Sequence, residues 1–92
     1  MYLEIVSPEA TLFQGEVNAV SVPGSQGSFQ VLNNHAAIVS SLTVGEAKIE
    51  GNIDVADAFK SLFTKKETDT IVSLSNGGTF EMSNNKAILF VD

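Results

Sequence analysis

The sequence lacks cysteine, arginine and tryptophan altogether. Without cysteine there is no disulfide, no thiolate nucleophile and no cysteine zinc site, which fits a reducing compartment. Arginine supplies most bidentate contacts to phosphate and guanine, so its absence argues against nucleic acid as a partner. Sugar-binding sites usually rely on exposed tryptophan and tyrosine, and the chain has a single tyrosine, Tyr2.

Basic residues and long apolar runs are also scarce. Five basic residues stand against eleven acidic ones, and the formal net charge is −6. This acidity predicts that charged partners carry basic patches. No basic segment precedes an apolar stretch at the N-terminus, so no signal peptide is expected. No apolar run approaches the ~20 residues of a membrane helix. Any membrane association is therefore expected only through another protein.

What is present is a succession of short strand patterns separated by turn residues. Strands are predicted at residues 2–6, 16–22, 28–32, 37–42, 46–50, 70–74, 79–82 and 86–91. The turns at residues 76–78 and 83–85 contain Asn and Gly, which suit positive φ. Short strands at ~8–12-residue spacing are typical of a sandwich or barrel. One all-β domain over residues 1–92 is expected, with about 8–10 strands.

The stretch from residue 52 to residue 66 breaks this rhythm. Its apolar residues recur at helical spacing, and two aspartates stand where a helix would begin. The pattern predicts a short amphipathic helix at about residues 54–64, packed on the sandwich. The apolar positions of this predicted helix are Val55, Phe59, Leu62 and Phe63.

The single histidine, His35, is the strongest candidate for chemistry, because histidine is the residue type used most often in acid–base catalysis and metal binding. Catalysis would also require a nucleophile and an orienting carboxylate. Ser40 and Ser41 lie on the next predicted strand, but no nucleophile-elbow motif surrounds them. A metal site would need further histidine or cysteine ligands. His35 is therefore expected to cap backbone carbonyls at a turn, and no catalytic residue, cofactor or metal is predicted.

The turn that follows Pro23 is the second unusual feature. Gly24 and Gly27 are expected to adopt backbone angles that other residues avoid. The tip between these glycines is polar and uncharged, and Phe29 lies behind it. A tight hairpin explains the glycines, and a docking surface is one interpretation of the uncharged tip.

The same region resembles the most characteristic segment of the epsilon subunit of F-type ATP synthases. That family shows a strand, Pro-Gly-x-x-Gly-x-Phe, a second strand, His-Ala-Pro, a third strand and a glycine turn. The matching residues here are Pro23, Gly24, Gly27, Phe29, His35, Ala36 and Gly45, with Ser7, Pro8, Phe13 and Gly15 before them and Gly77, Gly78, Glu81 and the strand 87–91 after them.

The resemblance covers residues 3–49 and 71–92, and it has departures. Ala37 stands where the family has proline after His-Ala, and Asn33-Asn34 replaces a Pro-Gly or Pro-Asn pair. The stretch 51–70 is longer than the family's hairpin. The family's C-terminal helical hairpin, which inhibits ATP hydrolysis and in some members binds ATP, is absent here, so those activities are not carried over.

The resemblance implies a flattened antiparallel β-sandwich that acts as a non-catalytic rotor subunit in the central stalk. Its partners would be the gamma subunit and the c-ring, at the cytoplasmic face of a bacterial inner membrane, and the isolated chain would be a monomer. The implied c-ring side comprises Gly24, Ser25, Gln26, Gly27, Ser28 and Phe29. The implied contact with gamma and the ring comprises Asn33, Asn34, His35, Ala36, Ala37, Ile38, Ser40, Ser41 and Leu42.

Two other functions remain open on the residues alone. One is a generic acidic β-sandwich that binds proteins or sugars. The other is a small hydrolase built on His35 and a carboxylate, for which the chain offers no catalytic motif. Co-purification with a membrane ATPase would separate all three hypotheses.

Overall fold

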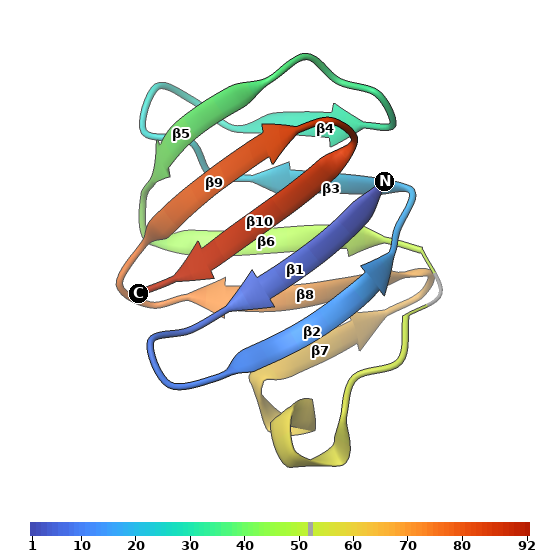
Figure 1. Cartoon of the computed structure of the whole chain (residues 1–92). Helices are drawn as coiled ribbons and strands as arrows, with labels where there is room; N and C mark the ends of the chain where they lie inside the picture. Colours follow the sequence, from blue (N-terminus) through green and yellow to red (C-terminus); the bar gives the residue numbers. More distant parts are fainter. Residues whose placement is uncertain (52) are drawn as a thin grey trace.

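The computed structural model describes residues 1–51 and 53–92. These residues form ten strands, arranged in two five-stranded sheets, and one 3-10 helix (Figure 1). The predicted all-β sandwich is confirmed. Sheet 1 contains β2 (Thr11–Glu16), β1 (Tyr2–Val6), β10 (Lys86–Val91), β9 (Gly78–Ser83) and β5 (Ile38–Leu42), in that spatial order. Sheet 2 contains β4 (Phe29–Leu32), β3 (Ala19–Val22), β6 (Gly45–Glu50), β8 (Asp69–Leu74) and β7 (Phe63–Lys66).

The sheets are not antiparallel throughout. The first and last strands, β1 and β10, pair in parallel from Tyr2 opposite Lys86 to Val6 opposite Phe90. The other strand pairs within the described ranges are antiparallel. Both termini therefore belong to the middle of sheet 1, where β1 and β10 have neighbours on each side.

The core lies between the two sheets and follows the period-two pattern of the strands. In β1, Leu3 and Ile5 are fully buried, whereas the other three residues of the strand are half-buried. Alternate residues of β9 and β10 do the same from the neighbouring strands. Burying these apolar side chains is the main source of stability for a domain of this size. The largest buried side chains are Phe80, Leu3, Ile5, Ile49, Leu74, Met82 and Leu89.

Positive-φ residues occur at both turns that were predicted to need them. Asn84 and Asn85 have φ of 52° and 59° and form the two-residue turn between β9 and β10, as expected for a hairpin of this length. Gly77 has φ of 73°. A Cβ atom at Gly77 would lie 2.6 Å from the carbonyl oxygen of Leu42, so this turn also requires glycine for space.

The short helix predicted at about 54–64 is present, but it is shorter than expected. A 3-10 helix spans Asp57–Leu62, and no side chain caps its start at Ala56. Phe63 already begins β7, and Leu62 is 50% exposed, so the helical face was predicted wrongly at that position. Phe59 does pack against the core. Asn52, where the pattern started, lies outside the described residues.

Two strands, β2 and β7, were not predicted. In β2 the adjacent residues Leu12 and Phe13 are both buried, and the register against β1 shifts between Ile5 and Val6. A bulge of this kind removes the simple alternation that marks a strand. β7 is an edge strand whose residues after Phe63 are exposed, so it has almost no apolar pattern. No helix within the described ranges is long and apolar enough to cross a membrane.

Candidate functional site

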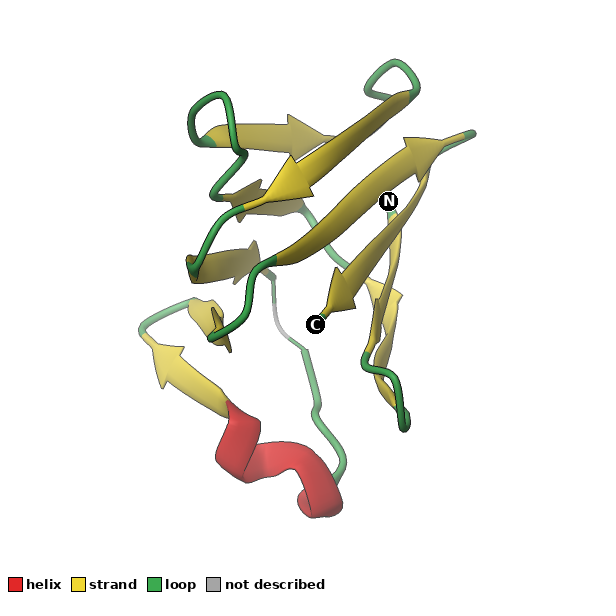
Figure 2. Ribbon diagram, turned by 90° about the vertical axis from the view of Figure 1, so that its left-hand side faces the viewer, coloured by secondary structure: helices red, strands yellow, loops and turns green. Residues whose placement is uncertain are grey.

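The residues predicted to bind partners lie along one edge of the sandwich. β5 is the last strand of sheet 1 and β4 is the first strand of sheet 2, so both sheets end here. We call residues 23–44, which include both strands and their turns, the β4–β5 edge. Figure 1 shows it at the top of the molecule, and in Figures 1 and 2 the 3-10 helix lies at the opposite end.

The first turn of this edge follows Pro23. The backbone N–H of Gly27 donates to the carbonyl of Gly24 at 2.9 Å, which closes the turn. Gly27 has φ of 123°, as predicted, whereas Gly24 has no positive φ. Gly24 is required for space instead, because a Cβ there would lie 2.8 Å from the ring of Phe29. The tip residues Ser25, Gln26, Gly27 and Ser28 are all exposed.

The first turn is also bonded to the end of β5. The N–H of Ser25 donates to the carbonyl of Ser41, and the N–H of Thr43 donates to the carbonyl of Pro23, both at 2.9 Å. Gly24 and Leu42 form an antiparallel bridge between these two bonds. The two segments that the sequence proposed as interfaces are therefore one continuous structure at this end of the edge.

The second turn lies at the other end of β4. The N–H of His35 donates to the carbonyl of Leu32 at 3.2 Å. Asn34 has φ of 61°, a conformation that Gly and Asn adopt readily at the third position of a turn. Asn33-Asn34 can therefore form the same kind of turn as the Pro-Gly pair of the ATP synthase epsilon family, which the sequence resembles. The Nδ1 atom of His35 lies 2.7 Å from the carbonyl oxygen of Ala36, so the ring caps its own turn.

Some of the predicted interface residues face the core rather than solvent. Gly24 and Leu42 are buried, and Phe29 and Ile38 are half-buried against the core. The ring of Phe29 packs edge-on against Phe80, with 6.2 Å between ring centres and 75° between planes. These residues support the edge by packing against the core. Among the predicted interface residues, those exposed to solvent are the tip residues of the first turn, the residues of the second turn and Ser41.

Three exposed apolar side chains of the same edge were missed. Leu32 is 55% exposed, Val39 is 72% exposed and Val44 is 70% exposed. The strand pattern offered a signal, because Ile38, Ser40 and Leu42 alternate inward and Val39 must then point outward. Leu32 lies on β4 of sheet 2, Val39 lies on β5 of sheet 1, and Val44 follows β5.

The edge carries no charged side chain. From Val17 to Gly45 the sequence contains no Asp, Glu or Lys, although charged residues make up 17% of the chain. Beside the edge, Glu81 of β9 is paired with Val39 of β5. The fully buried parts of protein interfaces are depleted of charge in the same way.

An open hollow of about 520 Å³ adjoins the edge on the outer face of sheet 1. Val39 and Ala37 line it from the edge, and Lys86 and Ile88 line it from β10. Its wide mouth and its mixed apolar and charged lining suit a protein side chain or loop better than an enclosed small molecule.

Comparisons with known proteins extend over the whole chain. Residues 1–92 match the family model described as ATP synthase, Delta/Epsilon chain, beta-sandwich domain. The ATP synthase epsilon chain of Chlorobaculum tepidum is 36% identical over 98% of this chain and 86% of its own length. The epsilon chain of Campylobacter curvus is 35% identical over 97% of this chain and 70% of its own length.

A solved structure shares the fold. In the central stalk and c-ring of the mitochondrial ATP synthase of Tetrahymena thermophila, one chain superposes with a TM-score of 0.70 at 15% sequence identity. The match covers 98% of this chain and 61% of that one. At this identity the similarity is one of fold.

Proposed function

Because this chain belongs to the family of ATP synthase delta/epsilon chains, as its β-sandwich domain, we propose that it is a non-catalytic rotor subunit. In this proposal it joins the gamma subunit to the c-ring of an F-type ATP synthase at the cytoplasmic face of a bacterial membrane. The relatives named ATP synthase epsilon chain support it.

The observation that carries the proposal is the uncharged β4–β5 edge. Its first turn, around Ser25 and Gln26, is assigned to the loops of the c-ring, because neutral polar side chains dock on polar loops without stranding a buried charge. Its second turn and β5, from Asn33 to Leu42, are assigned to gamma and the ring. Exposed Leu32 and Val39 add apolar area to this contact.

A rotor joint must transmit torque without slipping, so the parts in contact must be stiff. The first turn meets this demand because the backbone hydrogen bonds of Pro23 and Ser25 tie it to β5. The strand β5 is in turn paired with β9 over five residue pairs. A force applied at the edge therefore passes into both sheets. The net charge is −6, and the acidic residues lie outside the edge. In this proposal they attract basic partners at long range, and the uncharged edge makes the contact.

A generic sugar-binding role has less support. Among the described residues, the exposed large hydrophobic side chains are Leu32, Val39, Val44 and Leu62. All four are aliphatic, so they offer no aromatic platform for a sugar ring.

Cysteine cross-linking tests the proposal, since the chain has no cysteine of its own. Gln26→Cys places a thiol on the exposed tip of the first turn, and Thr64→Cys places one on β7 at the opposite edge of sheet 2. With a gamma–c-ring complex that carries one cysteine per ring loop, we expect a cross-link from position 26 and none from position 64. Failure of the unmodified chain to co-purify with gamma and the c-ring would refute the function. A cross-link from position 64 alone would refute only the assignment of the edge.

A further inference from the structure

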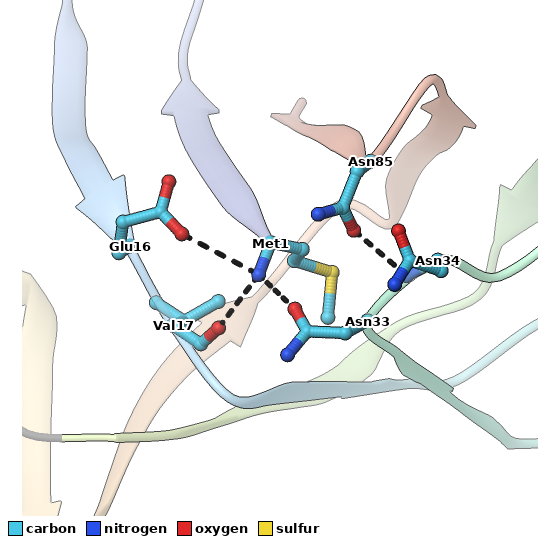
Figure 3. A network of polar contacts seen from close by, with 6 residues as sticks. All are labelled: Met1, Glu16, Val17, Asn33, Asn34 and Asn85. Atoms are coloured by element: carbon cyan, nitrogen blue, oxygen red, sulfur yellow. Dashed lines mark hydrogen bonds and ion pairs between the residues drawn. The ribbon is translucent and has the colours of Figure 1, made fainter.

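The second turn of the β4–β5 edge is held by two groups that are distant from it in sequence (Figure 3). The ammonium group of Met1 donates to the side-chain oxygen of Asn33 and, at 3.1 Å, to the carbonyl of Val17. Its charge is balanced by the carboxylate of Glu16 at 3.5 Å. Met1 itself is only 2% exposed, so this ammonium is fixed in the structure rather than free in solvent.

The second group is Asn85, in the turn between β9 and β10. Its side-chain Oδ1 accepts a hydrogen bond from the backbone N–H of Asn34 at 2.8 Å. Its backbone carbonyl accepts one from the N–H of Tyr2 at 3.1 Å. Asn85 therefore joins the start of β1, the β9–β10 turn and the second turn of the edge.

These contacts stand out because the segment they hold is exposed. Every residue from Asn33 to Ala37 is exposed, so little core packing fixes their conformation. An exposed loop normally loses backbone and side-chain freedom when it binds, and that loss weakens affinity. A loop that is already held in its bound shape avoids most of this loss.

We propose that Asn85 is a positioning group that holds residues 33–37 in the shape that docks on the partner. The inference rests on the proposed function, because it assumes that this loop binds gamma and the c-ring. It adds that the affinity depends on a residue that lies outside the β4–β5 edge, in the last hairpin of sheet 1.

The turn offers a matched pair of variants. Asn84 and Asn85 both have positive φ, so Asn→Gly is compatible with the backbone at either position. Asn85→Gly removes the acceptor for the Asn34 N–H, whereas Asn84→Gly leaves it in place. Asn85→Asp keeps an oxygen acceptor at the same place and is the rescue variant.

Two measurements are made on each variant: hydrogen exchange of the Asn34 amide, and affinity for a purified complex of gamma and the c-ring. Loss of one hydrogen bond corresponds to a change of about 2- to 12-fold. We expect Asn85→Gly to accelerate Asn34 exchange and to weaken binding by about this factor. Asn84→Gly and Asn85→Asp should stay within about 2-fold of the wild type in both measurements.

Each outcome has a distinct meaning. Faster Asn34 exchange with unchanged affinity overturns the proposal, because the shape of the loop would not limit docking, while the rotor function would stand. Equal weakening by Asn84→Gly and Asn85→Gly overturns the specific role of the Asn85 side chain. If the wild type does not bind gamma and the c-ring at all, the proposed function fails together with the docking role. Asn34 exchange would then report only whether Asn85 holds the loop.

Discussion

Replacing Val39 by a charged residue should weaken docking of the β4–β5 edge strongly, with little effect on folding. Val39 is 72% exposed and lies on the outward face of β5. Fully burying a valine side chain contributes about 1.5–3 kcal/mol, so covering the exposed part contributes about 1–2 kcal/mol. A charge buried there without a partner costs about 1–3 kcal/mol more.

The sum predicts that Val39→Asp weakens affinity for the gamma–c-ring complex by about 2–5 kcal/mol. This corresponds to a factor between about 30 and several thousand in Kd. The free chain should change far less. The introduced carboxylate would face Glu81 across the β5–β9 pairing, and like charges opposite each other cost about 0.2–1 kcal/mol. Urea unfolding of the variant measures this part separately.

Val39→Lys separates apolar docking from simple charge attraction. Lysine at this position would face Glu81 favourably, so the free chain should be at least as stable as with aspartate. If the edge docks through apolar contact, lysine and aspartate should both disrupt binding. If a basic partner is attracted by charge alone, lysine should weaken binding and aspartate should not.

Leu62→Asp provides the control, because Leu62 is 50% exposed but lies on the 3-10 helix at the far end of the molecule. It should leave the affinity unchanged. The reasoning is refuted if Val39→Asp and Val39→Lys both bind like the wild type, or if Leu62→Asp weakens binding as much as they do.

Two further predictions concern stability. Gly77→Ala should lower the free energy of unfolding by about 2–5 kcal/mol, because φ of 73° is unfavourable for alanine and the new Cβ would lie 2.6 Å from the Leu42 oxygen. Gly27 also has positive φ, at 123°, but nothing lies within 4 Å of an added Cβ, so urea unfolding of Gly27→Ala measures backbone strain without a steric clash. An unchanged free energy of unfolding in Gly77→Ala would contradict the steric argument. Phe59→Ala should lower stability by about 1–3 kcal/mol, since the ring is half-buried against the core, and should leave partner affinity unchanged. Normal thermal stability with weakened gamma binding would instead make the 3-10 segment a partner contact.

Much of the fold was predictable because strand alternation and turn chemistry are properties of neighbouring residues. The inward positions of β1 and the positive φ of Asn84 and Asn85 follow from local spacing and from the residues that tolerate such turns. The resemblance of the segment from Pro23 to Gly45 identified the family and the stretch of chain that forms the edge. Prediction failed where tertiary packing overrides the local pattern, as at the bulge between β1 and β2 and at Phe63, which pairs with Val72 instead of continuing a helix.

The sequence by itself determined the all-β class, most of the strands and an uncharged stretch that suits docking. Only the tertiary structure decided that β1 and β10 pair in parallel, that Val39 is exposed on the outer face, and that Met1 and Asn85 hold the turn of Asn33 and Asn34. The reason is physical. Contacts between residues far apart in the chain are set by how both sheets bury their apolar faces together, and no local spacing records that arrangement.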